Sequence, residues 1–501
     1  MYKLQSRRSH NHRTTELCYC STQPGSHRHI IAPALRLTVL CPTAPLPIAA
    51  PQNGFIAYIS VNPLPHVHGR CCHVVHLVQD VGGRLLCVPY DAHHGDLQRG
   101  EPSGGGERHL QPLRAAPTGD AGCPPARSPR LGCGRDDTPH VPDEQLGEEK
   151  VLHIIENLTS LIKQVFPDTK VYAAMGNHDF HPKNQFPGKE NRIYNQTAEL
   201  WRSWLNEASI PLFRAGAFYS EKLPSPDTRG RMVVLNTNLY YDQNNQTAGE
   251  EDPGGQFQWL EETLTNASKA EEMVYIVGHI PPGFFEKKRG KPWFRRDFNE
   301  RYLRIVQKHH GVIAAQFFGH HHTDSFRMFY SSSGSPINVM FLAPGVTPWK
   351  TTLPGVNNGA NNPGIRVVDY DADTLQVQDV VTYYLNLTHA NLMAPAWEEE
   401  YRLTSAFQVP DGSAPSMQTV LERISKDAKY LQQYYEFNSV RYDLALCGES
   451  CRADHVCAIR EIDFTRYEEC LKANSSASAI VSVCLLLLSL LLGIFGPQQT
   501  L

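Results

Sequence analysis

The stretch VYAAMGNHD, residues 171–179, joins an apolar run to a glycine that is followed by Asn177 and His178. Two more stretches repeat this arrangement, MVYIVGH at residues 273–279 and VIAAQFFGHHH at residues 312–322. Each apolar run predicts a buried strand, and glycine lets the chain turn sharply where that strand ends. A rigid strand fixes the side chain that follows it. Three such junctions in one chain predict a metal site that carries out hydrolytic chemistry.

The segments around these junctions predict alternating helices and strands. Apolar residues at helical spacing predict helices over Glu148–Val165, Gln256–Leu264 and Asp297–His309, each followed by a predicted strand. This alternation is typical of an α/β fold. Residues Phe326–Val381 alternate apolar and polar side chains and predict a closing antiparallel sheet, and Met417–Tyr435 predicts one long helix.

Composition limits the classes of function. The chain has 501 residues, a net charge of −4 and a pI near 6.6. This length allows a large core with two or three structural units. There is no basic stripe or basic tail, so we expect no binding of nucleic-acid polymers.

Residues 1–134 differ from the rest of the chain. They hold eight of the thirteen Cys and fifteen of the thirty-six Pro, with twelve Arg against one Lys. No helical or strand period persists there, and no secretory signal follows Met1. One interpretation is a disordered extension. The other is translated sequence from outside the protein's own reading frame, joined to a genuine domain, and the composition favours this second interpretation.

The C-terminal end predicts membrane attachment. Ile480–Phe495 is almost entirely apolar, small residues precede it at Ser475–Ala479, and no Lys or Arg follows. This pattern is typical of a GPI-attachment signal. The alternative is a single C-terminal membrane helix, for which the run is slightly short. We favour the GPI anchor and expect the protein at the extracellular face of the plasma membrane.

Cysteines and glycosylation sequons also indicate the secretory route. Four Cys within 24 residues suit either a zinc site or two disulfides, and their spacing lacks the paired Cys-x2-Cys of zinc sites. Three connectivities are open, of which we favour Cys447–Cys451 and Cys457–Cys470. Five Asn lie in acceptor sequons and are predicted glycosylation sites: Asn157, Asn195, Asn245, Asn266 and Asn386.

The side chains at the junctions suit a pair of divalent ions. Imidazole nitrogens, an amide oxygen and a carboxylate are ligands that Zn2+ accepts. Two ions about 4 Å apart can hold a phosphate and activate water. A carboxylate that bridges the ions offsets their repulsion, and Asp136, in the stretch GRDDTPH at residues 134–140, is the candidate.

Four motifs together identify a family. They are Asp136-Asp-Thr-Pro-His140, Gly176-Asn-His-Asp-Phe-His-Pro182, Gly278-His-Ile-Pro-Pro-Gly283 and Gly319-His-His-His-Thr-Asp324. From Asp136 onward the chain resembles the acid sphingomyelinase-like phosphodiesterases of the calcineurin-like metallophosphoesterase superfamily. Its apolar tail makes it most similar to their GPI-anchored b-type. The resemblance implies an α/β (α+β sandwich) metallophosphoesterase fold with a small helical, disulfide-bonded C-terminal module.

The resemblance also implies a role for each motif residue. Asp136 would bridge two zinc ions, Asn177, His279 and His320 would complete one site, and His322 would bind the second ion. His178 would protonate the leaving group or hold a phosphate oxygen, Asp179 would orient His178, and His140 would face the phosphate. Because the unperturbed pKa of His is near 6.5, His178 suits proton transfer in a mildly acidic compartment. Substrates would be phosphodiesters such as sphingomyelin-type lipids or nucleotide derivatives.

These expectations divide the chain into four parts. Residues 1–134 are an atypical segment, 135–395 a metallophosphoesterase domain that is incomplete at its N-terminus, 396–474 a helical Cys-rich module and 475–501 the GPI signal. The incompleteness concerns the family's first motif, Asp-x-His at the end of the first strand. The only candidate is Asp91-Ala-His93, after a run that contains Pro89.

A missing first motif would have two consequences. The second zinc would keep only Asp136 and His322, and the centre of the sheet would lack a strand. The alternative to a two-zinc phosphodiesterase is therefore a catalytically impaired or inactive variant that acts at most as a membrane-anchored binding protein.

Overall fold

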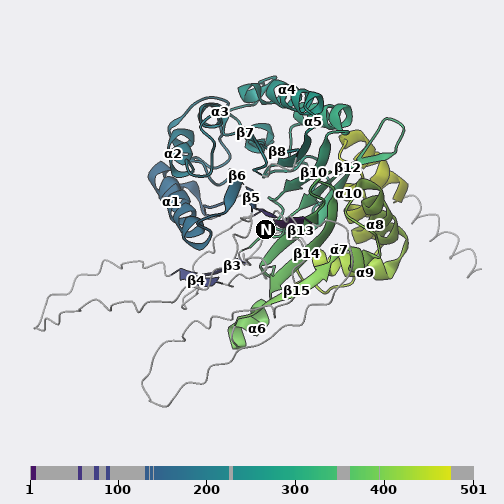
Figure 1. Cartoon of the computed structure of the whole chain (residues 1–501). Helices are drawn as coiled ribbons and strands as arrows, with labels where there is room; N and C mark the ends of the chain where they lie inside the picture. The colour runs from purple at the N-terminus through teal and green to yellow at the C-terminus, as the bar shows by residue number, and fades with distance from the viewer. Residues whose placement is uncertain are drawn as a thin grey trace, which may run out of the picture.

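The structure is a computed structural model. It describes residues 136–138, 140–224, 229–346, 361–393 and 395–474, and the backbone alone of five early strands at residues 2–6, 55–58, 73–77, 86–90 and 130–134. Two sheets of seven and six strands share one apolar core. In Figure 1, helices α1 to α3 lie to one side of the sheets, α4 and α5 lie at the top, and α8 to α10 lie on the other side. The predicted α/β class is confirmed.

The first sheet contains the strand that leads to Asp136. Its strands run in the order β15-β14-β13-β1-β2-β5-β6. Strands β5 (Arg130–Gly134) and β6 (Lys170–Ala174) are parallel, with Gly134 opposite Ala174. Asp136 and Asn177 follow these two strands, so both residues emerge at the same edge of the sheet. The other members are β1 (Tyr2–Ser6), β2 (Phe55–Tyr58), β13 (Gly364–Tyr370), β14 (Val377–Leu385) and β15 (Trp397–Arg402).

The predicted gap at the centre of this sheet is not present. Strands β1 and β2 lie between β13 and β5, and they pair antiparallel with Tyr2 opposite Tyr58. Segments from the atypical region therefore lie where a strand was expected to be missing, and the N-terminal incompleteness of the domain stays a prediction. Strand β4 (Leu86–Tyr90) instead pairs with β3 (His73–Leu77) in a separate two-stranded sheet. Asp91 and His93, which follow β4, lie outside the described residues.

The second sheet supplies the two histidine junctions. Its order is β11-β12-β10-β9-β8-β7. The predicted strands are present as β9 (Met273–Val277) and β10 (Ile313–Phe318), which are parallel with Val277 opposite Phe317. His279 and His320 therefore emerge at one edge. The remaining strands are β7 (Tyr219–Lys222), β8 (Gly230–Val234), β11 (Ser325–Tyr330) and β12 (Pro336–Leu342).

The prediction of one closing antiparallel sheet is only partly confirmed. Strands β11 and β12 are antiparallel, as are β13 and β14. However, the first pair belongs to the second sheet, the other pair belongs to the first sheet, and β12 is parallel to β10. Alternation along the sequence gives each strand its buried face but does not show which sheet a strand joins.

Helix α1 spans Glu148–Val165 as predicted, with Val151, Ile155 and Ile162 buried on one face. The predicted single helix over 417–435 is wrong. It is broken at Asp427, whose extended backbone ends α8 and whose side chain accepts the amide of Lys429 as the N-cap of α9. The other helices are α2 (Arg192–Leu200), α3 (Ile210–Gly216), α4 (Gln256–Lys269), α5 (Arg296–His309), α6 (Leu387–Leu392), α7 (Leu403–Phe407), α8 (Ala414–Lys426), α9 (Ala428–Asn438) and α10 (Glu449–Arg460).

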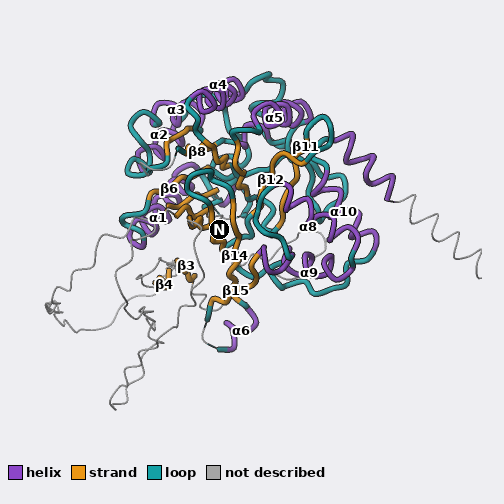
Figure 2. The backbone as a smooth tube through the Cα atoms, turned by 45° about the vertical axis from the view of Figure 1, so that its right-hand side comes forward, coloured by secondary structure: helices purple, strands orange, loops and turns teal. Residues whose placement is uncertain are grey.

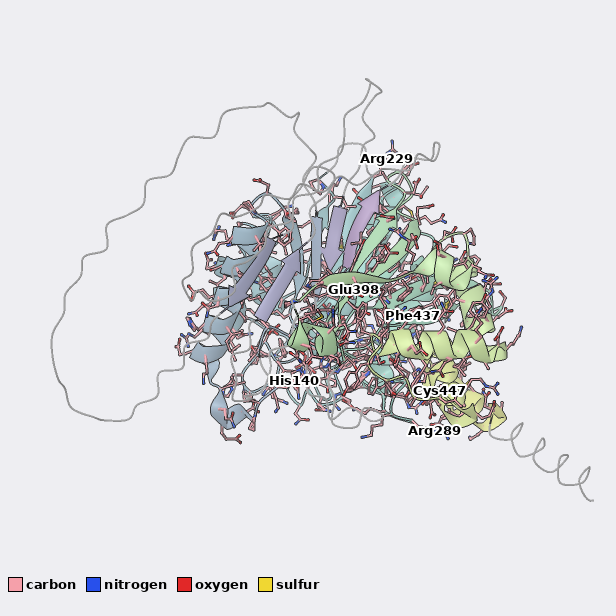
Figure 3. All side chains as sticks on the ribbon, turned by 90° about the horizontal axis from the view of Figure 1, so that it is seen from below. His140, Arg229, Arg289, Glu398, Phe437 and Cys447 are labelled. Carbon is pink, nitrogen blue, oxygen red and sulfur yellow. A yellow bond between two sulfur atoms is a disulfide. The ribbon has the colours of Figure 1, made fainter. Side chains whose placement is uncertain are left out.

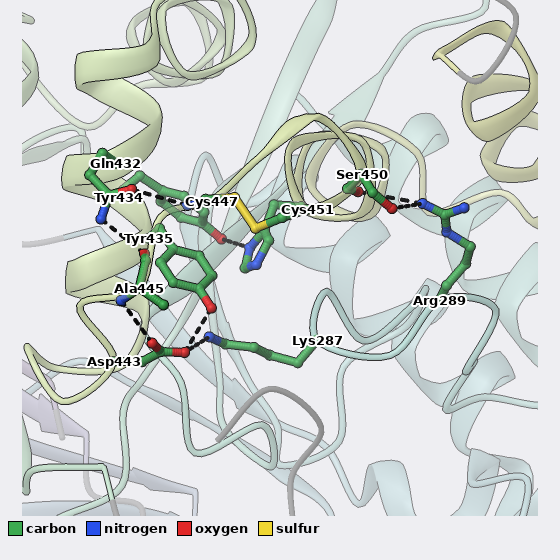
Figure 4. The surroundings of a disulfide bond; sticks show 11 residues. Lys287, Arg289, Gln432, Tyr434, Tyr435, Asp443, Ala445, Cys447, Ser450 and Cys451 are labelled. Carbon is green, nitrogen blue, oxygen red and sulfur yellow. Dashed lines mark hydrogen bonds and ion pairs between the residues drawn. A yellow bond between two sulfur atoms is a disulfide. The ribbon is translucent and has the colours of Figure 1, made fainter. Parts of the chain in front are cut away.

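The C-terminal helices pack beside the second sheet, where Figure 2 shows α8 and α10 next to β11 and β12. Disulfides join Cys447 to Cys451 and Cys457 to Cys470, which confirms the favoured pairing and excludes a zinc site at these cysteines. Figure 4 shows the first of these bonds, which joins Cys447, just before α10, to Cys451 in the first turn of α10. No helix in the described part is long and apolar enough to cross a membrane. The predicted GPI signal, residues 475–501, lies outside the described residues.

Candidate metal centre

Four side chains from four strand ends meet at one edge of the two sheets. Oδ1 of Asn177 lies 3.1 Å from Nε2 of His279 and 3.0 Å from Nδ1 of His320. The two imidazole nitrogens are 3.3 Å apart, and Oδ2 of Asp136 lies 3.4 Å from Nε2 of His279. Arg229 immediately precedes β8 and so marks the amino end of that strand. Figure 3 shows Arg229 at the opposite end of the molecule from His140, which is next to this group. The site is thus at the carboxyl ends of the strands, as the three junctions predict.

These donor atoms fit a divalent cation. Ligand atoms about 2.1 Å from a tetrahedral ion lie about 3.4 Å from one another, close to the separations seen here. Asp136 is fully buried, and its Oδ2 accepts no hydrogen bond from any described residue. A buried, unpaired carboxylate oxygen is costly unless a cation satisfies it. Asp136, His279 and His320 form one of the groups of described side chains that could hold a metal ion.

The orientation of Asn177 is fixed by Asn184, a residue that the sequence analysis missed. Oδ1 of Asn184 accepts the Asn177 Nδ2–H group at 2.8 Å, so Oδ1 of Asn177 must face the histidines. The Asn184 amide also donates to the Asn177 carbonyl at 2.9 Å. Asn184 has a positive φ of 69°, a conformation that Asn adopts more readily than most residues. That tendency was the only signal in the sequence.

The loop that carries Asp136 is tied to the loop after β6. The amide of His178 donates to Oδ1 of Asp136 at 2.8 Å. Asp179 accepts the amides of Asp137 at 2.6 Å and of Gly176 at 2.8 Å, so its two oxygens join the loops together. We predicted that Asp179 orients His178. In the structure, the carboxylate of Asp179 accepts hydrogen bonds from these backbone amides. Its structural task is to hold Asp136 beside Asn177.

The charge of Asp136 is stabilised by its surroundings. Burial opposes ionisation of this carboxyl group, but the nearby rings of His279, His178 and His140 outweigh burial, and the pKa of Asp136 is held well below its ordinary value. Asp136 is therefore an anion in the described structure. An anion surrounded by imidazole nitrogens is the electrostatic arrangement that a cation requires.

Three further histidines line the site on the other side of Asp136. The rings of His140 and His178 are stacked with centroids 3.6 Å apart, and Nε2 of His140 lies 3.5 Å from Oδ2 of Asp136. The ring of His322 stands edge-on to His140 at 5.2 Å. Asp136, His140 and His178 form a second potential metal group, to which His322 does not belong. The predicted metal-binding and catalytic residues that the structure describes are thus all in one place.

Burial lowers the pKa of His178 to about 3, although the charge of Asp136 opposes this shift. The ring is therefore neutral near physiological pH. Proton transfer by His178 was expected from the pKa of a free histidine, and burial removes that basis. The structure is compatible with the other predicted role of His178, in which a ring N–H group donates a hydrogen bond to a phosphate oxygen.

The comparisons with known proteins agree with this geometry. The calcineurin-like phosphoesterase family matches residues 142–324, and the acid sphingomyelin phosphodiesterase C-terminal region matches residues 335–477. The acid sphingomyelinase-like phosphodiesterase 3b of Mus musculus is 64% identical over 357 residues, which cover 71% of this chain and 78% of that protein. The chain belongs to the acid sphingomyelinase-like phosphodiesterases. The predicted enzyme class, a phosphoric diester hydrolase of the metallophosphoesterase fold, is confirmed.

Two more distant relatives of this phosphodiesterase differ in their named activities. The cyclic GMP-AMP phosphodiesterase of Homo sapiens is 40% identical over 340 residues, 67% of this chain and 74% of that protein. The sphingomyelinase phosphodiesterase C of Dictyostelium discoideum is 37% identical over 344 residues, 67% of this chain and 76% of that protein.

In this chain, two aromatic side chains lie beside His320. Trp293 lies edge-on to the His320 ring at 4.4 Å, and Tyr241 does so at 5.5 Å. Nζ of Lys291 sits 4.9 Å from the centre of the Trp293 ring and 2.7 Å from Oδ2 of Asp242. None of these residues is part of a motif, so sequence reasoning did not find them. They place a half-buried indole ring, with a cation above it, on one side of the site.

The five predicted glycosylation sites differ in exposure. Asn245 and Asn266 are exposed, whereas Asn157, Asn195 and Asn386 are half-buried. The half-buried three use their side chains within the fold. Asn195 donates to Glu190, Asn386 caps α6 by accepting from His389, and Asn157 lies 3.2 Å from a His153 ring nitrogen. Glycosylation at all five positions stays a prediction.

Proposed function

We propose that this chain is a zinc-dependent phosphodiesterase that hydrolyses sphingomyelin-type lipids or nucleotide phosphodiesters. One observation carries the proposal. Asp136, Asn177, His279 and His320 point one oxygen or nitrogen each at a common point, at separations of 3.0–3.4 Å. Mixed nitrogen and oxygen ligands at such spacing suit Zn2+ better than Mg2+ or Ca2+, which prefer oxygen ligands alone.

The protein's own residues would position the phosphate. When bound, a pair of divalent ions supplies an activated water and offsets the charge that develops on the phosphoryl oxygens. Asp136 would help to hold the ions, and His322, whose ring lies 5.2 Å from that of His140, would help to hold the second one. The stacked rings of His140 and His178 donate N–H hydrogen bonds to phosphate oxygens.

Two features support the substrate classes. The relatives from Homo sapiens and Dictyostelium discoideum are named for a cyclic dinucleotide and for sphingomyelin, respectively. In this chain, the half-buried Trp293 beside His320 can pack against a nucleobase or against the apolar part of a lipid, with the buried Tyr241 behind His320. We propose that this wall selects the group attached to the phosphate.

Turnover of bis(p-nitrophenyl) phosphate by the zinc-loaded chain tests the proposal. His279→Ala removes a ligand, and we expect it to lower turnover by at least about 100-fold because the ion loses a fixed donor. The matched control is His310→Ala, which changes an exposed histidine at the end of α5. Equal turnover by His279→Ala and the control would contradict the proposal. No turnover by the unmodified chain would favour the alternative of an inactive binding protein.

We further propose that the enzyme is secreted, glycosylated and held at the cell surface by a GPI anchor. Its two disulfides suit an oxidising compartment, and the five sequons and the apolar end of the chain suit the same route. Phosphatidylinositol-specific phospholipase C should release the protein from intact cells into the medium. Retention on the cells after this treatment would favour a membrane helix.

A further inference from the structure

A buried carboxylate that belongs to no motif lies behind the metal centre. Glu286 follows β9 and is fully buried. It accepts four hydrogen bonds, two at each oxygen. Oε2 accepts from Nη2 of Arg327 at 2.5 Å and from Nδ1 of His321 at 3.1 Å, and Oε1 accepts from Thr323 at 2.7 Å and from Asn438 at 2.9 Å.

These bonds alternate with the candidate metal ligands along one loop. His320 and His322 face the metal centre, whereas His321 and Thr323 face Glu286. Both His320 and His322 have positive φ angles, 69° and 57°, which are unfavourable for side chains with a Cβ atom. Such a backbone persists only where the surroundings impose it. The contacts of His321 and Thr323 with Glu286 provide that constraint.

The tautomer of His321 is also fixed. Its Nε2 accepts the indole N–H of Trp293 at 2.6 Å, so its Nδ1 carries the proton that is donated to Glu286. Trp293 is the same residue that stands edge-on to His320. Glu286 is therefore linked through one imidazole to the aromatic wall of the site and to the ligand loop.

The C-terminal helical region holds this loop from the other side. The Asn438 amide group at the end of α9 donates to Glu286 and to the carbonyl of Asp324 at 3.0 Å, and the Asp324 amide donates to the Asn438 carbonyl at 3.0 Å. The residues after Glu286 are clamped to the same region. Nε of Arg289 lies 2.5 Å from Asp454, and Figure 4 shows Lys287 reaching toward Asp443.

We propose that Glu286 and Asn438 are positioning residues that set the direction of His320 and His322, so that the C-terminal helical region controls how tightly the phosphodiesterase holds its metal. This inference rests on the metal centre of the proposed function. Neither residue touches a reacting atom. Groups that orient metal ligands typically change metal affinity by about 10–100-fold when they are removed.

The alternative is that Glu286 and Arg327 form a structural ion pair without influence on the metal. The chain contains a matched pair for comparison. Glu272 is 7% exposed and accepts from Arg231 at 2.8 Å and Lys222 at 2.9 Å, at the start of β9 and away from the site. Glu272→Gln thus weakens the ion pairs of a buried glutamate just before β9, without a contact to the ligand loop.

Cobalt binding to the full chain distinguishes the two interpretations. Co2+ in a site of nitrogen and oxygen ligands gives a visible absorption spectrum that reports ligand geometry. We expect Glu286→Gln to weaken Co2+ affinity by about 10–100-fold and to change the spectrum, while Glu272→Gln has neither effect. The near-UV circular dichroism of each variant shows whether it is folded. Asn438→Ala keeps the Glu286–Arg327 pair, and we expect it to weaken affinity in the same direction; it decides the outcome if Glu286→Gln does not fold.

The cobalt experiment distinguishes failure of the metal centre from failure of the positioning role alone. If the unmodified chain gives no cobalt spectrum, the metal centre and this inference both fall. If the unmodified chain binds Co2+ and both Glu286→Gln and Asn438→Ala bind it with unchanged affinity and spectrum, the proposed function stands and the positioning role is wrong.

Discussion

Two buried glutamates in different parts of the molecule have opposite surroundings. Glu286 beside the ligand loop accepts four hydrogen bonds. Burial would raise its pKa, but Arg327 and His321 outweigh burial and hold the pKa well below the ordinary value. Glu400 on β15 is 5% exposed, and neither carboxylate oxygen has a hydrogen-bond partner among the described residues. Burial raises the pKa of Glu400 to about 8, against the opposing charges of Arg441 and Arg366.

The difference shows that hydrogen-bond and charge partners, rather than the degree of burial, determine whether a buried carboxyl group is ionised. A charged carboxylate is stable in the interior only if it is paired and hydrogen-bonded. The region behind the metal centre meets this condition fully, and the β15 region does not. We infer that Glu286 is retained as an anion for the loop that it orients, whereas Glu400 is a neutral acid at pH 7.

Removal of the satisfied glutamate should have the largest effect on stability. Glu286→Ala leaves Arg327 buried without its anion, so we expect a loss of about 3–5 kcal/mol in the free energy of unfolding. Urea denaturation measures this loss. The double variant Glu286→Leu/Arg327→Met should recover most of it, because no unpaired charge is left. A loss below about 1 kcal/mol in Glu286→Ala would remove the contrast between the two glutamates.

The unsatisfied glutamate should behave in the opposite way. The pKa of Glu400 rises from an ordinary value of 4.5 to about 8 on folding. Folding therefore takes up a proton between these values, and stability falls as the pH rises through that window. Glu400→Gln stays neutral, so we expect it to be more stable than the unmodified chain by roughly 1–3 kcal/mol at pH 7.5 and about equal at pH 4. Thermal unfolding at both pH values measures this difference; a destabilised variant at pH 7.5 would show that Glu400 works as a paired anion.

A smaller effect of pH should come from His455 on α10. Burial lowers its pKa from 6.5 to about 3, so the unfolded chain binds a proton between these values that the folded chain does not. Stability therefore falls as the pH falls through this window, by about 2 kcal/mol between pH 7 and pH 5. His455→Phe keeps a ring between Tyr434 and Tyr435 and should lose this component of the acid sensitivity. An unchanged dependence on pH, measured by urea denaturation at pH 5 and pH 7, would assign the effect to other groups.

The parts of the molecule that the sequence predicted are those set by short-range patterns. Apolar runs that end in glycine located Asn177, His279 and His320, and helical spacing located α1 with its correct ends. The break at Asp427 was missed because helical periodicity continues across it. Glu286, Asn184 and Trp293 were missed because each acts through partners that only the folded chain brings near. The hydrogen bond from Asp137 to Asp179 was missed for the same reason, since it joins two loops that are far apart in the sequence.

Metal content of the purified chain is the most direct test of the account. After expression with zinc and removal of loosely bound ions, inductively coupled plasma mass spectrometry counts the ions per chain. We expect at least one zinc ion per unmodified chain and per His310→Ala chain, and less than about one tenth of that in Asn177→Ala and His279→Ala, because each loses a donor of the same ion. An unmodified chain without zinc, or ligand variants with undiminished zinc, would contradict the account.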